Sequence, residues 1–111
     1  MKHTVREEQD TAVVALEGDV DLEHSPEARK VLLECVRQGR HVLVDMSGVA
    51  YIDSSGVASL VEAFQNARHA GTRFALAAVS NSALRVLELA RLDKVFTIHP
   101  TVAEGMSSNA Q

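Results

Sequence analysis

Short apolar runs alternate along this chain with stretches of helical periodicity, and this alternation limits the folds open to it. The runs at 11–16, 41–46, 74–79 and 95–99 have the composition of β-strands. Helical patterns lie between them and begin near residues 25, 54 and 82. Strands that are joined through a helix need a crossover connection, so they pair in parallel. The alternation therefore predicts a mostly parallel sheet covered by helices.

An N-terminal hairpin adds one antiparallel strand to this prediction. Residues 2–6 form the partner of the run at 11–16, and residues 7–10 connect the two. The element order is then two strands followed by three helix-strand units. Val42, Leu43 and Val44 form an unbroken apolar run, as a strand buried on both faces requires, which places this strand centrally. We expect an α/β fold whose mixed, mostly parallel sheet has four to five strands, with helices packed mainly on one face.

The length and composition of the chain fit one compact domain. Its 111 residues are 46% hydrophobic, which is enough for a single sizeable core and too little for two domains. The pair Ser25-Pro26 predicts a helix N-cap followed by the first helical residue. We expect residues 1–106 to form the domain and the polar residues 107–111 to form a frayed tail.

The charge and residue content argue against several classes of function. A net charge of −4 lacks the cationic surface that nucleic-acid backbones attract, so we expect no direct nucleic-acid binding. The five histidines are widely separated and Cys35 is the only cysteine, so we predict neither a metal site nor a disulfide framework. Neither a phosphate-binding glycine motif nor a nucleophile elbow occurs, and we predict no cofactor and no catalytic residues.

The sequence also predicts where the protein acts. The N-terminal residues lack an apolar signal-peptide core, and no run approaches the roughly 20 apolar residues that span a bilayer. We therefore expect a cytoplasmic protein without membrane insertion.

Small polar residues crowd one predicted strand-to-helix corner, at Asp53-Ser54-Ser55-Gly56. Capping explains part of this pattern, because an Asp or Ser side chain accepts hydrogen bonds from the free N–H groups of the first turn. Capping needs only one side chain, however, and this corner offers three. The surplus leaves hydroxyl groups available to another molecule and makes the corner a candidate site.

The order of elements and this corner together resemble the STAS family, named for sulphate transporters and anti-sigma factor antagonists. The segment Gly18-Asp19-Val20-Asp21 is similar to the family's acidic loop before the first helix, and Val42-Leu43-Val44-Asp45 to its central strand. The segment Asp53-Ser54-Ser55-Gly56 is the most specific element of the resemblance. The resemblance covers nearly the whole chain and points to the stand-alone anti-sigma factor antagonists.

The resemblance implies a phosphorylation switch at Ser54. In that family a partner serine kinase, which is itself an anti-sigma factor, phosphorylates the serine after the aspartate, and a serine phosphatase resets it. The unphosphorylated form binds the kinase, and phosphorylation releases it. The expected partner contacts are Asp19, Asp21, Asp53, Ser54, Ser55, Gly56 and Val57.

Two other functions stay open for the same fold, because a fold does not determine the partner. Small STAS proteins also serve as accessory subunits of membrane lipid-transport ATPases, a function that needs binding but no phosphorylation. The same switch can also regulate a signalling output other than a sigma factor. For each function we expect a monomer.

Overall fold

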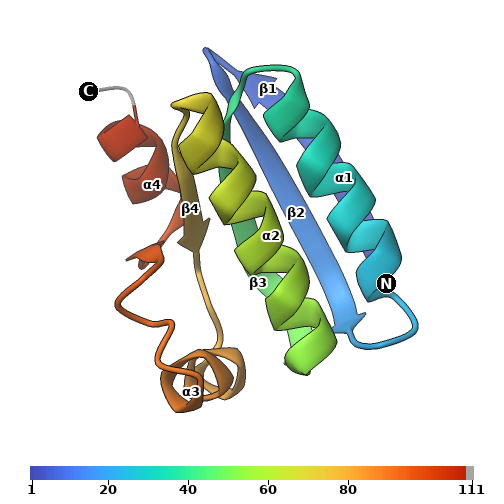
Figure 1. The fold of residues 1–111 in the computed structure, drawn as a ribbon. Helices are drawn as coiled ribbons and strands as arrows, with labels where there is room; N and C mark the ends of the chain where they lie inside the picture. The colour runs from blue at the N-terminus through green and yellow to red at the C-terminus, as the bar shows by residue number, and fades with distance from the viewer. Residues whose placement is uncertain (110–111) are drawn as a thin grey trace.

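The computed structural model describes residues 1–109, which form one α/β domain (Figure 1). The predicted order of strands and helices is confirmed, and one further helix follows the last strand. The elements are β1 (Lys2–Glu8), β2 (Thr11–Val20), α1 (Ser25–Arg37), β3 (His41–Ile52), α2 (Ser54–Ala70), β4 (Phe74–Ala77), α3 (Asn81–Leu89), β5 (Thr97–His99) and α4 (Val102–Asn109).

The five strands form one mixed sheet in the order β1-β2-β3-β4-β5. β1 pairs with β2 antiparallel, and every later pair is parallel, as the helical connections predicted. β3 is the middle strand. Its side chains at 42, 43 and 44 are fully buried, which confirms the central position expected from the unbroken apolar run.

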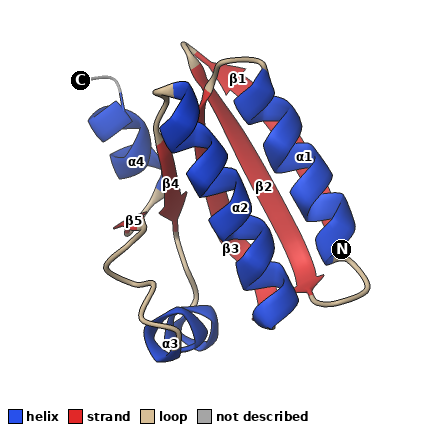
Figure 2. Ribbon diagram, in the orientation of Figure 1, coloured by secondary structure: helices blue, strands red, loops and turns tan. Residues whose placement is uncertain are grey.

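Most helical packing lies on one face of the sheet, where α1 and α2 run side by side over the strands (Figure 2). Alternate residues of β2 and β3 point into this layer, because successive side chains of a strand face opposite sides. Val14, Val44 and Leu32 belong to this main core. The intervening residues of β3 and β4 form a smaller cluster on the other face, around Leu43, Ala75 and Ala77.

Helix α4 covers that second face and was absent from the sequence prediction. Val102 and Met106 of α4 pack against the smaller cluster. The Thr101 hydroxyl accepts a hydrogen bond from the Glu104 N–H at 3.1 Å and so caps the helix start. Because α4 reaches Asn109, the first part of the expected tail is helical in the structure, and residues 110–111 lie outside the described part of the chain.

The boundaries of α1 and α2 show how well local signals place helix ends. Gly71 ends α2 in the left-handed conformation, with φ of 76°, as its position after the apolar stripe indicated. The predicted N-cap of α1 was wrong by one residue. Ser25 is already helical, and His24 takes the cap position without a side-chain cap. The helix start is held instead by Asp21, as described below.

Candidate functional site

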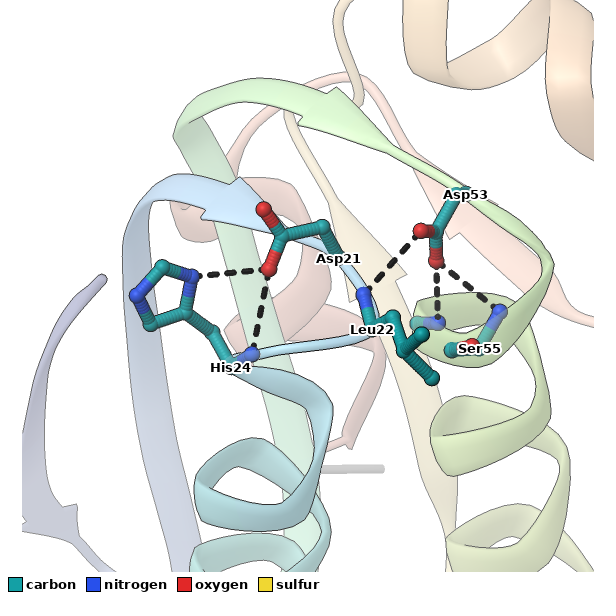
Figure 3. A network of polar contacts seen from close by, with 6 residues as sticks. Asp21, Leu22, His24, Asp53 and Ser55 are labelled. Atoms are coloured by element: carbon teal, nitrogen blue, oxygen red, sulfur yellow. Dashed lines mark hydrogen bonds and ion pairs between the residues drawn. The ribbon is translucent and has the colours of Figure 1, made fainter.

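The candidate site lies at the carboxyl ends of β2 and β3, which are neighbours in the sheet. Val20 pairs with Ile52 at the last position of this ladder. The loop 21–24 then leads into α1, and Asp53 leads into α2. The two predicted segments, the acidic loop and the polar corner, therefore lie beside each other (Figure 3).

Asp53 joins the two segments through its carboxylate. One oxygen accepts the backbone N–H groups of Ser55 and Gly56 at 2.9 and 3.1 Å, which caps α2. The other oxygen accepts the N–H of Leu22 at 3.0 Å, across 31 residues of sequence. Both carboxylate oxygens are thus committed within the chain. We call Asp53 the clasp, because it joins the acidic loop to α2. Of the three polar side chains at the corner, Asp53 is the one that caps the helix.

The side chain of Ser54 takes no part in capping α2. Its side chain is exposed at the first position of α2. Within residues 1–109 its hydroxyl makes no hydrogen bond, because Asp53 already serves the first-turn amides. Ser55 is half-buried, and its carbonyl accepts a hydrogen bond from the Ser59 hydroxyl at 3.2 Å. Of the two adjacent serines, Ser54 is therefore the one offered to another molecule.

Gly56 and Val57 lie inside the protein, although we expected them among the partner contacts. Val57 is 7% exposed and packs in the main core. At Gly56, a Cβ atom would lie 2.2 Å from the Val20 carbonyl oxygen and 2.7 Å from Cγ1 of Ile52. The glycine lets α2 approach the end of β2. The close approach that this residue allows is to the chain's own backbone, and neither side-chain position reaches the surface.

Asp21 and Asp19 differ in their surroundings. One Asp21 oxygen accepts the His24 backbone N–H at 3.0 Å and contacts its Nδ1 at 2.8 Å. Burial raises the pKa of the Asp21 carboxyl, but the hydrogen bonds and charge of His24 outweigh burial and bring that pKa below its ordinary value. Asp19 is exposed. Asp19, which lies near the end of β2 and not in the loop, thus presents its carboxylate to solvent, whereas the Asp21 carboxylate is held by the start of α1.

Comparison with known families decides what kind of domain carries this site. The family model described as STAS domain matches residues 2–105. The chain belongs to the STAS domain family. The Asp53–Ser54 corner lies within the matched residues.

Relatives of this STAS domain include proteins named for a regulatory function. It is 27% identical over 94 residues to the anti-sigma-B factor antagonist of Listeria monocytogenes, covering 84% of this chain and 82% of that protein. The anti-sigma-B factor antagonist of Bacillus subtilis is 23% identical over 94 residues, covering 85% of this chain and 86% of that protein.

Solved structures share its fold. An anti-sigma factor antagonist of Mycobacterium paratuberculosis superposes with a TM-score of 0.91 at 22% identity, over 99% of this chain and 94% of that one. The Bacillus cell fate determinant SpoIIAA in its phosphorylated form superposes with a TM-score of 0.76 at 18% identity, over 96% of this chain and 98% of that one. At these identities the superpositions establish a common fold.

Three residues of the STAS site were missed from the sequence. Leu22 has 73% of its surface exposed beside the clasp, although it is a large apolar residue. His24 holds Asp21, and the buried Ser59 donates to the carbonyl of Ser25 at 3.2 Å, tying α2 to α1. The signal for Leu22 was an isolated leucine between acidic residues in a loop, where no core position is expected.

The remaining chemistry of the domain lies away from this corner. Cys35 is buried, and burial raises the pKa of its thiol, which keeps it in the less reactive neutral form. Among residues 1–109 no group of three or more His, Cys, Asp or Glu side chains is placed to hold a metal ion. No helix in the same range has the length and apolar character to cross a membrane.

Proposed function

We propose that this STAS domain is an anti-sigma factor antagonist that works by phosphorylation-controlled partner switching. Its unphosphorylated form binds an anti-sigma factor serine kinase and so withdraws it from a sigma factor. Phosphorylation of Ser54 by that kinase releases the complex, and a serine phosphatase restores Ser54. The names of the Listeria and Bacillus relatives support the antagonist assignment.

The observation that carries the proposal is that Asp53 holds the corner together while the neighbouring Ser54 stays exposed. Asp53 commits both carboxylate oxygens to backbone N–H groups, so the corner keeps its shape without help from Ser54. Ser54 is exposed and its hydroxyl has no hydrogen-bond partner within residues 1–109. A kinase can therefore modify Ser54 without first breaking a structural contact.

A phosphate on Ser54 would meet little compensation within this chain. It adds about −1.5 to −2 charges at neutral pH. A helix start normally offers N–H groups to an anion, but the Ser55 and Gly56 amides already bind Asp53. The neighbouring Asp53 carboxylate is itself negatively charged, and the adjoining loop carries a second carboxylate at Asp21. The added charge therefore projects to solvent and to whatever partner covers the corner.

The same electrostatics explain release of a partner. A surface that fits a neutral hydroxyl would have to desolvate an unmatched dianion after phosphorylation. A penalty of about 3 kcal/mol corresponds to more than a hundredfold in dissociation constant, which suffices for an on-off switch. The fold itself should persist, because within residues 1–109 the Ser54 hydroxyl makes no hydrogen bond that a phosphate would break.

The surface available to the partner is acidic and includes the exposed apolar side chain of Leu22, with the half-exposed Tyr51 opposite Asp19 in the ladder. It consists of the exposed or half-buried residues around the clasp, namely Asp19, Asp21, Leu22, Asp53, Ser54 and Ser55. Such a surface fits a partner that presents basic groups around an apolar depression. The proposed action is protein binding in the cytoplasm, with no catalysis by this chain, no membrane insertion and no direct contact with nucleic acid.

The test is calorimetric titration of an anti-sigma serine kinase from the source organism with four forms of the full chain. Wild type and Ser54→Ala should bind alike, whereas Ser54→Glu should bind at least about tenfold more weakly. Ser107→Glu places the same charge on an exposed serine of α4, on the other face of the sheet, and should bind like wild type. Equal affinity of Ser54→Glu and Ser107→Glu would refute the switch.

A pull-down from lysate of the source cells separates the remaining functions. Wild type should retain an ATP-binding kinase that Ser54→Glu does not retain. Recovery of lipid-transport ATPase subunits by both forms would assign the chain to transport instead. Recovery of a kinase with no sigma factor in its pathway would keep the switch and change its output.

A further inference from the structure

The sheet is open at β1, its N-terminal edge strand. β1 is the first strand in the sheet order and pairs only with β2 among the described elements. All seven of its residues are exposed. In Figure 2 it lies at the edge farthest from β5 and α4. The outward N–H and C=O groups of an edge strand are able to pair with a further strand.

β1 has no backbone feature that blocks such pairing, and its protection lies in its charged side chains, Lys2, Arg6, Glu7 and Glu8. It contains no proline, and its register with β2 runs without a shift from Lys2 opposite Glu17 to Glu8 opposite Thr11. Proteins commonly protect an edge with a bulge, a proline, a very short strand or charged side chains, and of these β1 carries the charges. The charges of the β1 side chains therefore determine which further strand is able to pair with this edge.

We propose that β1 pairs antiparallel with β1 of a second copy of this chain, about a two-fold axis at Val5. Edge-to-edge pairing of identical strands about a two-fold axis is antiparallel. With the axis at Val5, Lys2 faces Glu8 of the other copy, and His3 faces Glu7 of the other copy. Each of these two pairs occurs twice by symmetry, and Val5 meets its own equivalent.

The charge pattern selects this register over its neighbours. Two residues that lie directly opposite each other across the pairing must point to the same face of the sheet. The two-fold axis must therefore pass at a residue and not between two residues, so alternative registers differ by one residue in the position of the axis. An axis at Thr4 would set Lys2 opposite Arg6 of the other copy. An axis at Arg6 would set the two Arg6 side chains against each other. Of the three central registers, only the Val5 axis brings opposite charges together without facing like charges.

Existing contacts prepare the strand for this pairing. His3 contacts Glu27 at 2.9 Å, and Glu7 pairs with Arg40, so both side chains are already held on the α1 face. On the other face, Lys2 makes no ion pair within residues 1–109. Glu8 lies on the same face and pairs with Arg6 of its own strand, with Nε and Oε1 2.8 Å apart, and its carboxylate would also face Lys2 of a second copy.

The paired sheet leaves the Ser54 corner open. Because the two β1 strands run in opposite directions, the corners of the two copies point to opposite ends of the continuous sheet. The pairing is carried by the edge strand alone and does not rest on the proposed switch. It replaces the monomer expected from the sequence with a reversible dimer.

Charge-reversal variants of the full chain, studied by sedimentation velocity over a broad concentration range, test the pairing. Lys2→Glu and Glu8→Lys should each dimerise about tenfold or more weakly than wild type, because each creates two like-charge pairs. An equal mixture of the two should regain wild-type association, because positions 2 and 8 of one variant then face side chains of opposite charge on the other. Lys94→Glu changes the net charge equally in the exposed segment before β5 and should dimerise like wild type. A wild type that stays monomeric, or a mixture no stronger than the single variants, would overturn the proposal.

Cross-linking tests the register independently. Val5, which is 43% exposed, lies on the axis, so Val5→Cys should form an intermolecular disulfide with oxidised glutathione. Thr4→Cys faces Arg6 of the other copy in this register and should not. Native Cys35 is buried and does not compete. Cross-linking of Thr4→Cys as fast as Val5→Cys would refute the Val5 axis.

Discussion

Replacing Gly56 by alanine tests how α2 is seated against the sheet. The new methyl carbon would lie 2.2 Å from the Val20 carbonyl oxygen, 2.7 Å from Cγ1 of Ile52 and 3.0 Å from Cγ1 of Val20. The first of these atoms belongs to the backbone of β2, which its pairing with β3 holds in place. The helix start must therefore move, and the Asp53 clasp moves with it.

The size of the effect follows from these contacts. Overpacking of this kind costs about 1–3 kcal/mol, and a shift by the better part of 1 Å places Gly56 near the upper end. Alanine recovers up to about 1 kcal/mol through its greater helix propensity. The net loss should be about 2 kcal/mol, which lowers the melting temperature of a domain of this size by about 10 °C.

Gly105→Ala is the matched control for this substitution. Gly105 also lies within a helix, but its new methyl carbon would meet only side-chain ends, with Cδ2 of Leu43 at 2.8 Å and Cδ2 of His99 at 3.2 Å. These groups are able to rotate, so the loss should stay below about 1 kcal/mol. The melting temperatures of both variants, measured by calorimetry, test whether the loss of stability is larger at Gly56 than at Gly105. If Gly56→Ala melts within about 2 °C of wild type, or no lower than Gly105→Ala, the reasoning is wrong.

Three further predictions concern the clasp and its surface. Asp53→Ala removes the acceptor of three backbone N–H groups and should lower the free energy of unfolding by about 2 kcal/mol in urea titrations; a loss below about 0.5 kcal/mol would contradict the clasp. Leu22→Ala should leave stability within about 0.5 kcal/mol of wild type yet weaken kinase binding by about tenfold in calorimetry, and unchanged affinity would remove Leu22 from the contact surface. The pKa of Asp21 is lowered in the folded state, so its carboxylate stabilises the fold above its unfolded pKa, and this contribution is lost as pH falls through the folded pKa. Asp21→Asn should therefore be less stable than wild type at neutral pH, with the gap closing below about pH 4 in thermal melts; a gap independent of pH would exclude the carboxylate charge as its source.

Local pattern was sufficient for most of the fold because most elements carry a clear periodicity. The apolar run at Val42–Val44 indicated a strand buried on both faces, and the stripe of α2 ended at Gly71 as predicted. Helix α4 escaped prediction because its eight residues contain Gly105 and a polar C-terminal half. Its position is stabilised by packing on Leu43, which comes from a distant part of the chain.

The candidate site was predictable in place and only partly in detail. Surplus polarity at 53–56 marked the corner, and the parallel topology set the acidic loop beside it. The burial of Gly56 was not visible in the sequence, because it results from the crossing of α2 over the end of β2. The backbone position of Leu22 was likewise not visible, because its N–H donates a hydrogen bond to Asp53, 31 residues away.

The sequence alone determined the alternation of strands and helices, the central strand and the polar corner, since these follow from periodicities and turn chemistry within a few residues. Only the tertiary structure decided which polar side chain caps α2 and which faces solvent. That choice depends on the loop at Leu22, whose N–H draws the Asp53 carboxylate inward and leaves Ser54 exposed. Contacts between distant segments depend on how the layers pack, so no single local segment of the sequence predicts them.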